Sequence, residues 1–216
     1  MNSDLFSSDY NFELLPLQGA EVLLLRHLDL PRPAETLLSE LIRETPWRSE
    51  EITVWGKKHL QPRLIAWYGD EGRNYTYSGI SMNPLPWSQT LSELRMLVES
   101  KCNDVFNSVL LNYYRDGRDS MGFHSDNEPE LGLRPTIASL SLGESRSFAF
   151  KPKSDIKSSP FNIELASGSL LLMKGDTQLN WKHGIAKSSR PLGPRLNLTF
   201  RKIEMPKRVE PRPNAA

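Results

Sequence analysis

The chain has 216 residues, of which 38% are hydrophobic and 25% are charged. This composition is ordinary for a globular protein, and the length allows one sizeable core. Its 27 basic and 26 acidic side chains nearly cancel, so bulk charge cannot attract nucleic acid, and any such binding must come from local patches. A single cysteine, Cys102, excludes an intramolecular disulfide and suits a reducing compartment.

The N-terminal part of the chain predicts a loose arm followed by helical segments. Residues 1–20 lack the basic stretch and apolar core of a secretory signal and are expected to be loosely ordered. No apolar run reaches membrane-spanning length, so we expect an intracellular, soluble protein with no membrane partner, cytoplasmic in a bacterium or nuclear in a eukaryote. Residues 33–43 and 91–100 have apolar side chains at helical spacing and predict two amphipathic helices that pack against a sheet.

Residues 50–83, between these helices, carry aromatic and basic side chains that suit nucleotide recognition. Glu51–His59 predicts a strand entering a turn, with Trp55 near the tip beside two lysines. An aromatic on a basic hairpin can wedge into a base stack while lysines meet phosphate; the alternative is a core position for Trp55. Tyr75 and Tyr77 lie two residues apart and hence on one face, and they are the candidate lid of a site, with a core position as the alternative.

From residue 105, short strand-like segments alternate with Gly, Pro, Asn and Asp turns. This pattern predicts a mainly β protein with flanking helices (α+β) around a double-stranded β-helix, or jelly-roll, core. We expect one domain over residues 21–203, with a nucleotide-recognition hairpin and lid at 50–83 and the β-helix core at 105–203. Residues 204–216 combine proline, charge and small side chains and predict a disordered tail.

Two histidines and an aspartate form a candidate metal site. His124 and Asp126 are separated by one residue, so in an extended chain both side chains leave the backbone on the same side. Adding His183 gives a two-His, one-carboxylate set, which binds Fe(II) and leaves positions open for a co-substrate and oxygen. Taken singly, each histidine is more often a surface or core residue. The metal site is favoured because the three residues occur in an ordered set with Asn112 and Tyr114 before them and Arg195 and Arg201 after them.

Residues 195–201 predict a strand with one strongly cationic face. Alternation places Arg195, Asn197, Thr199 and Arg201 on that face and apolar side chains on the other. An ordinary surface strand would expose such charges to solvent, but two arginines flanking Asn and Thr also form a donor-rich face suited to a small dianion. Because arginine binds a carboxylate through two parallel hydrogen bonds, lysine would be a poorer substitute there.

These segments together resemble one family, the AlkB-type dioxygenases that depend on Fe(II) and 2-oxoglutarate, and in it the branch that repairs alkylated bases in duplex DNA. The resemblance spans roughly residues 50–203. The segments that carry it, in family order and at family-like spacing, are VWGKKHLQPRLIAWYGD, NYTYSGI, VLLNYYRDG, FHSDNEPEL, IASLSLGESRSFAF, GSLLLMKGDTQLNWKHGI and PRLNLTFRKI.

The resemblance implies a role for each candidate residue of the catalytic centre. The iron ligands would be His124, Asp126 and His183. The 2-oxoglutarate contacts would be Asn112 and Arg201 at its keto-acid end, Tyr114, Asn197 and Arg195 at its far carboxylate, and Thr199 in the same pocket.

The resemblance also implies contacts to the damaged base. Trp55 would fill the gap that the flipped base leaves, and Tyr77 would stack on that base opposite the ring of His124. Asn127 and Glu128 would contact its pairing edge, where a carboxylate can accept from an exocyclic amino group. Arg63 at the rim is a candidate phosphate contact; Lys151 and Lys153 are further candidates, with a merely solvated face as the alternative.

The activity implied is oxidative dealkylation of N-alkylated bases such as 1-methyladenine and 3-methylcytosine in DNA. It would use Fe(II), O2 and 2-oxoglutarate and release formaldehyde, succinate and CO2, and a monomer would bind the DNA, which we expect to be double-stranded. The serine-rich loop KSDIKSSPFNIELASG departs from those of duplex-repair enzymes, which leaves the strand preference open. Alternatives are the same chemistry on RNA or protein, a non-catalytic damaged-DNA-binding protein, and a cupin-type isomerase, which gives no reason for the paired arginines.

Overall fold

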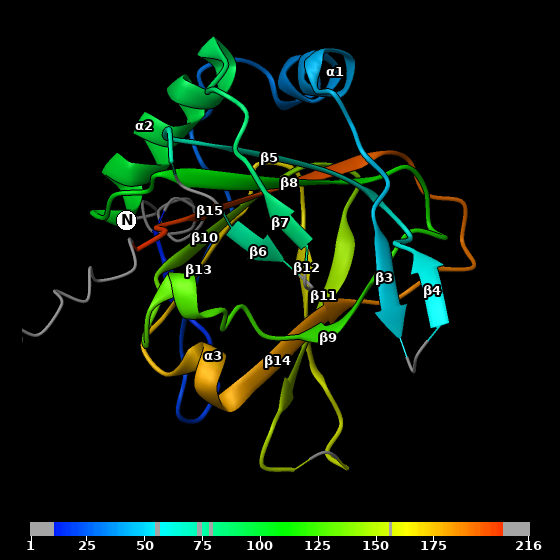
Figure 1. Cartoon of the computed structure of the whole chain (residues 1–216). Coiled ribbons are helices and arrows are strands. Elements are labelled where there is room, and N and C mark those ends of the chain that lie inside the picture. The colour runs from blue at the N-terminus through cyan, green and yellow to red at the C-terminus, as the bar shows by residue number, and fades with distance from the viewer. Residues whose placement is uncertain (1–10, 55–56, 73–74, 78–79, 156, 205–216) are drawn as a thin grey trace, which may run out of the picture.

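The computed structural model describes residues 11–54, 57–72, 75–77, 80–155 and 157–204. Its two larger β-sheets enclose a common interior, and two long helices cover the other side of the larger sheet (Figure 1). The prediction of a mainly β protein with flanking helices and a jelly-roll core is therefore confirmed. No helix in the described ranges is both long and apolar enough to cross a membrane.

The larger sheet has seven strands, and every adjacent pair runs antiparallel. Its central strands are buried on both faces, and polar side chains alternate with apolar ones along residues 195–201. In order across the sheet the strands are β1 (Glu13–Leu14), β2 (Glu21–Leu25), β13 (Leu170–Lys174), β10 (Ile137–Gly143), β15 (Arg195–Arg201), β8 (Ser108–Tyr114) and β5 (Leu64–Gly69).

The smaller sheet has four antiparallel strands. Phe148, Phe150 and Ile185 point from it into the interior, where they pack with residues of the larger sheet such as Leu171 and Met173. In order across the sheet the strands are β12 (Phe161–Leu165), β11 (Arg146–Pro152), β14 (Trp181–Ile185) and β9 (Met121–His124). Strand β9 therefore forms one edge of this sheet.

Helices α1 (Ala34–Glu44) and α2 (Gln89–Cys102) confirm the two helices predicted over 33–43 and 91–100. Their buried leucines join one core cluster with the larger sheet. Helix α2 begins where Ser88 Oγ accepts a hydrogen bond from the Leu91 amide, at 3.2 Å, and ends at Asn103, whose φ of 51° is left-handed. Both helices therefore lie on the side of the sheet away from the interior.

Side chains alternate between the two faces of β15, so one face packs in the apolar core and the other faces the interior. Leu196, Leu198 and Phe200 belong to the cluster under the helices, so the opposite face, which carries Arg195 and Arg201, points to the interior between the sheets. The whole strand is buried. The sequence prediction of two faces is confirmed, and the structure removes the alternative of a solvent-exposed cationic face.

Two hairpins and two short helices complete the described part of the fold. The hairpin predicted around residues 51–59 is confirmed, but its tip with Trp55 lies outside the described residues. The side chains of Tyr75 and Tyr77 also lie outside them. The elements are the hairpin of β3 (Glu51–Val54) and β4 (Lys57–Leu60), the hairpin of β6 (Tyr75–Tyr77) and β7 (Ile80–Met82), the 3-10 helix η1 (Pro129–Leu131) and the short helix α3 (Thr177–Asn180).

The structure departs from two of the expected boundaries. Residues 13–14 pair with β2, and Leu15 and Leu17 are buried in the interior cluster, so the second half of the expected arm is ordered. Strands β2 and β5 also belong to the seven-stranded sheet, although the expected core began at residue 105. Both strands pair with partners that are distant in the chain, β13 and β8, and a local sequence pattern does not reveal such pairing.

Candidate active site

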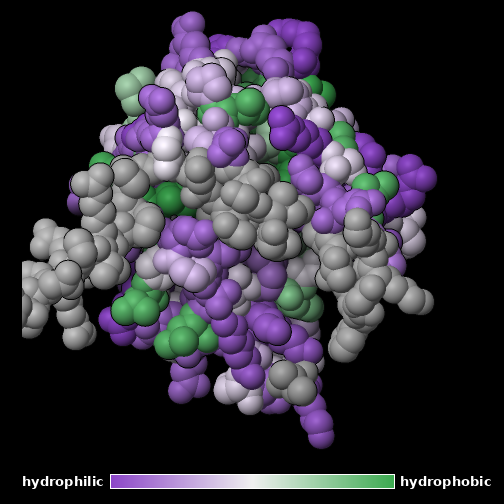
Figure 2. Space-filling model, viewed as in Figure 1, coloured by the Kyte–Doolittle hydropathy of each residue, from purple (hydrophilic) through white to green (hydrophobic). Residues whose placement is uncertain are grey.

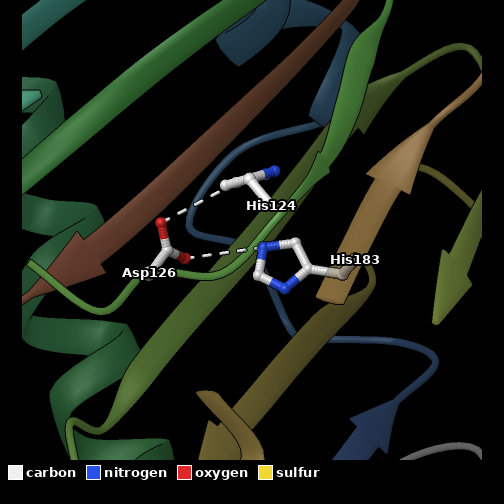
Figure 3. Close-up of side chains that lie close together, drawn as sticks. All are labelled: His124, Asp126 and His183. Carbon is white, nitrogen blue, oxygen red and sulfur yellow. Dashed lines mark ion pairs between the residues drawn. The ribbon is translucent and has the colours of Figure 1, made fainter. Parts of the chain in front are cut away.

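Strands β9 and β14 bring the three predicted metal ligands together. His124 ends β9 and lies directly opposite His183 of β14, and Asp126 follows two residues after His124. Nε2 of His124 is 3.8 Å from Oδ1 of Asp126, and Nε2 of His183 is 3.6 Å from Oδ2. The carboxylate faces both rings (Figure 3). One donor atom from each residue lies within 4.8 Å of the others, which suits a single ion bound on one face.

Neighbouring residues orient both imidazole rings. Nδ1 of His124 donates to the carbonyl of Gly122 at 3.0 Å, which leaves Nε2 as the metal-binding nitrogen. The His183 ring stacks on Phe148, with centroids 5.3 Å apart and planes 18° apart. Gly184 allows β9 to approach, because a Cβ there would lie 2.9 Å from the carbonyl oxygen of Met121.

The ionisation states suit a cation. Burial lowers the pKa of His124, and burial, followed by the neighbouring His124, lowers the pKa of His183 to about 3. Both rings are therefore neutral near pH 7, the form that binds metals. Burial by itself would raise the pKa of Asp126, but the charge of Arg201 and then the two imidazoles, which are protonated at low pH, outweigh it and lower that pKa to about 2. The donor set is thus already deprotonated.

Arg201 holds the carboxylate ligand from behind. Its Nη2 donates to Oδ1 of Asp126 at 2.6 Å, and each side chain is only 2% exposed. A buried carboxylate without a partner would be strongly unfavourable. The arginine therefore stabilises Asp126 in its charged form and fixes its orientation.

A second buried arginine provides an anion site. Arg195 is 1% exposed, and its Nη2 donates to Ser141 Oγ at 2.9 Å. Its Nε and Nη1 are buried and have no hydrogen-bond partner among the described residues, and its guanidinium lies 5.3 Å from the Tyr114 ring centre. Burial lowers the pKa of Arg195 to about 10, so it remains charged at pH 7. Unpaired buried donors are unfavourable. The arrangement therefore fits a carboxylate that accepts hydrogen bonds from both Nε and Nη1 of Arg195.

One cavity connects the metal ligands with the predicted co-substrate residues. It lies between the two larger sheets, since residues of β8 and β15 line it together with residues of β9 and β14. Tyr114, which lies against Arg195, also lines it. The other polar lining residues are His124, Asp126, His183, Asn112, Ser139, Asn197, Thr199 and Arg201. A chelating dicarboxylate could therefore contact the metal and the cationic strand in one space.

Arg63 is not where it was expected. It is 4% exposed, and its Nε donates to Oδ1 of Asn112 at 2.7 Å, so it does not lie at an exposed rim; its contact with a phosphate stays a prediction. The physical reason is that Arg63 directly precedes β5, which pairs with β8 beside Asn112. Of the two residues predicted to contact the base after Asp126, Asn127 is exposed and Glu128 is half-buried; their contacts stay predictions.

Three supporting residues were missed from the sequence. Ser141 and Ser139 accept from Arg195 and from Asn197 Nδ2, the latter at 2.6 Å. Their alternation with leucine in IASLSLG was a signal that could have placed them on the interior face. Gln178 is 3% exposed, and its Oε1 accepts from the backbone amide of Asp126 at 2.9 Å. No local sequence pattern predicts that contact, because the two residues are far apart in the chain.

Comparison with known proteins decides the family. A family model described as 2OG-Fe(II) oxygenase superfamily matches residues 21–201. The chain belongs to this superfamily. The oxygenase is 38% identical to the alpha-ketoglutarate-dependent dioxygenase alkB homolog 3 of Mus musculus over 94% of this chain and 73% of that protein, and 39% identical to the DNA oxidative demethylase ALKBH2 of Homo sapiens over 81% of this chain and 70% of that protein.

A solved structure agrees with the fold of the oxygenase. The structure of OsALKBH1 superposes with a TM-score of 0.57 at 18% identity, covering 89% of this chain and 100% of that one. The relatives also place the oxygenase in the AlkB family. It is an enzyme, a dioxygenase that uses Fe(II), 2-oxoglutarate and O2. Its metal and anion sites are intact, so the alternative of a non-catalytic binding protein has no support in the described site.

Replacing Gln178 should weaken metal binding in the oxygenase measurably. Replacing it by methionine keeps the volume but removes the acceptor for the Asp126 amide, so we expect Mn(II) affinity to fall about tenfold, as for other outer-shell partners. Titration of the metal-free protein, followed by Mn(II) electron paramagnetic resonance, measures this. Met173→Leu is the matched control, because it removes only the sulfur that accepts from Gln178 Nε2 at 3.5 Å. Equal Mn(II) affinity in Gln178→Met and wild type would contradict the role.

Proposed function

We propose that the enzyme removes alkyl groups oxidatively from the ring nitrogens of bases in DNA, with 1-methyladenine and 3-methylcytosine as substrates. The observation that carries the proposal is 39% identity over 81% of the chain to a protein named DNA oxidative demethylase. The His124, Asp126 and His183 cluster, opening on one cavity with Arg201, supports it, since that chemistry needs both a metal and an anion site.

The residues divide the work between metal and co-substrate. His124, Asp126 and His183 would hold Fe(II), which with 2-oxoglutarate and O2 supplies the oxidation of the alkyl carbon. Arg201 keeps the Asp126 carboxylate charged and oriented. Arg195 would bind the far carboxylate of 2-oxoglutarate through the donors that lack a partner. The methyl carbon gains an oxygen atom, its bond to the ring nitrogen breaks, and formaldehyde leaves.

Two further roles concern the co-substrate and its orientation. Asn112 would contact the keto-acid end of 2-oxoglutarate, and the bond that its Oδ1 accepts from Arg63 leaves its amide N–H groups for that contact. Asn197 and Thr199 line the same cavity and are hydrogen-bonded to each other at 3.2 Å. Together these side chains would fix the co-substrate against the metal and exclude water from the polar end of the cavity.

Base recognition is proposed from the sequence. Tyr77, with Tyr75, would cover the extruded base, and Trp55 would fill the gap in the duplex. Glu128 would accept a hydrogen bond from an exocyclic amino group, which favours adenine and cytosine lesions; a positively charged lesion gains further from its carboxylate. In this proposal the partner is alkylated DNA, and the hairpin of β3 and β4 favours a duplex.

Formaldehyde release and base repair on matched single- and double-stranded oligonucleotides that carry 1-methyladenine test the function. We expect turnover that requires Fe(II) and 2-oxoglutarate, with the duplex repaired at least as well as the single strand. His124→Ala is the control, because it removes one ligand without disturbing the Asp126–Arg201 pair. The DNA assignment fails if no DNA strand is repaired while the protein still binds 2-oxoglutarate, and matched RNA oligonucleotides then become the next substrate to measure.

A further inference from the structure

The outer face of the smaller sheet carries an exposed aromatic ring beside the catalytic strand. Phe123 directly precedes His124 in β9 and is 44% exposed. Because side chains alternate along a strand, its ring lies on the face opposite the metal ligand. Nζ of Lys151, on the neighbouring strand pair β11–β14, lies 6.0 Å from the centre of that ring. An aromatic face and a cation therefore lie together on the surface.

This face also concentrates positive charge. Lys151 and Lys182 lie directly opposite each other on β11 and β14, a placement that is unfavourable for like charges. Lys153 also lies near Lys182. Burial and then the charge of Lys182 lower the pKa of Lys153. In the described ranges, no carboxylate forms an ion pair with any of the three lysines. A polyanion would relieve their repulsion.

The position of the ring connects this surface with the active site. Strand β9 is the edge strand of the smaller sheet. No further strand of that sheet therefore lies between Phe123 and the space between the two sheets. Figure 2 shows mostly hydrophilic residues around β14, with hydrophobic patches beside them near α3. A flexible DNA strand whose damaged nucleotide lies at His124, on the inner face, could therefore pass around this edge of the sheet. Its next nucleotides would then lie on the outer face.

We propose that Phe123, Lys151 and Lys182 form a binding surface for single-stranded DNA next to the lesion, with a base stacked on the Phe123 ring and the lysines at the phosphates. The proposal rests on the proposed function and adds a path for single-stranded substrates, besides the duplex that the hairpin of β3 and β4 favours. Stacking on aromatic rings combined with a basic groove is how proteins hold single strands without reading sequence. A duplex cannot follow this path, because it is stiff over about 150 base pairs, whereas a single strand can turn around an edge.

Binding of an undamaged labelled 20-mer to the Mn(II)-loaded protein, measured by fluorescence anisotropy, tests the surface. Phe123→Ala should weaken single-strand affinity by about tenfold, the loss of one stacked base, and leave the affinity for the matching duplex within about twofold of wild type. Phe123→Trp should retain the affinity, and Phe123→Leu should lose it, because leucine supplies apolar area without a ring. Met96→Ala, at a side chain of α2 that is 62% exposed, is the matched control and should change nothing.

A salt titration reports on the lysines independently. Changing Lys151 and Lys182 to glutamine should reduce the slope of log affinity against log salt on the single strand by about 0.7 for each phosphate that a lysine no longer neutralises. If Phe123→Ala binds the single strand like wild type, or weakens single strand and duplex equally, the proposal is overturned. An unchanged salt slope in the double lysine variant would likewise exclude the phosphate contacts.

A short substrate separates this inference from the proposed function. The mononucleotide 1-methyl-2′-deoxyadenosine 5′-monophosphate has no neighbouring base to place on the outer face, so formaldehyde release from it depends on the active site alone. Wild type and Phe123→Ala should demethylate it at equal rates. If both do so while single-strand binding of the 20-mer is unaffected by the substitution, the surface is refuted and the demethylase function stands. If wild type releases formaldehyde neither from this mononucleotide nor from a 20-mer that carries 1-methyladenine, the proposed function fails, and the inference with it.

Discussion

Asp126→Asn should abolish turnover and lower Mn(II) affinity by more than about 100-fold, beyond the 10- to 100-fold typical of outer-shell changes. The substitution keeps the shape of the side chain but removes the charged ligand. It also removes the partner of Arg201, and both members of that pair are 2% exposed. We therefore expect the free energy of unfolding of the metal-free protein to fall by about 3 kcal/mol, as when one partner of a buried ion pair is removed.

The two effects of Asp126→Asn can be separated by a double variant. If the stability loss comes from the charge of Arg201, then adding Arg201→Met to Asp126→Asn should recover part of it, while Mn(II) binding stays lost. Urea unfolding of the four proteins in the thermodynamic cycle gives the coupling energy between the two sites. Additive stability changes would contradict the assignment of Arg201 as the group that stabilises the carboxylate.

Arg195→Lys should raise the dissociation constant of 2-oxoglutarate at least about tenfold, even though the charge is kept. The planar guanidinium offers Nε and Nη1 to a carboxylate while Nη2 stays bonded to Ser141, and an ammonium group cannot reproduce that geometry. Isothermal titration of the Mn(II)-loaded protein with 2-oxoglutarate measures the effect. Ser141→Ala removes only the supporting hydrogen bond and should weaken binding by less.

A co-substrate analogue shows whether Arg195 acts on the far carboxylate. 2-Oxopentanoate keeps the keto acid and the five-carbon chain but lacks that carboxylate. Arg195→Met should weaken binding of 2-oxoglutarate strongly and leave binding of 2-oxopentanoate nearly unchanged. An equal loss for both ligands would mean that the substitution damages the metal end or the fold. Unchanged 2-oxoglutarate binding in Arg195→Lys would refute the anchor.

The sequence predicted the parts of the site whose signal is local. One intervening residue between His124 and Asp126 indicates a shared side of an extended chain, and the alternation of residues 195–201 indicates a cationic face. The two amphipathic helices follow from helical spacing in the same way. The iron and 2-oxoglutarate assignment then came from the order of these segments along the chain, which resembles one family.

The parts that were missed depend on contacts between distant elements. Gln178 meets the amide of Asp126 only because α3 lies beneath the turn after β9. Arg63 is buried only because β5 pairs with β8, and Lys151 meets Lys182 only because of the register between β11 and β14. Strand register and sheet order are set by packing of the whole domain, so such neighbours appear only once the structure is known.

The measurement that tests the central claim most directly is the stoichiometry of turnover on a DNA strand that carries 1-methyladenine. The enzyme with Fe(II), 2-oxoglutarate and O2 should produce one formaldehyde and one succinate for each base restored, and His124→Ala should produce none of the three. Succinate formed without formaldehyde or restored adenine, however fast, would contradict the account, because the metal and co-substrate site would then be active on something other than alkylated DNA.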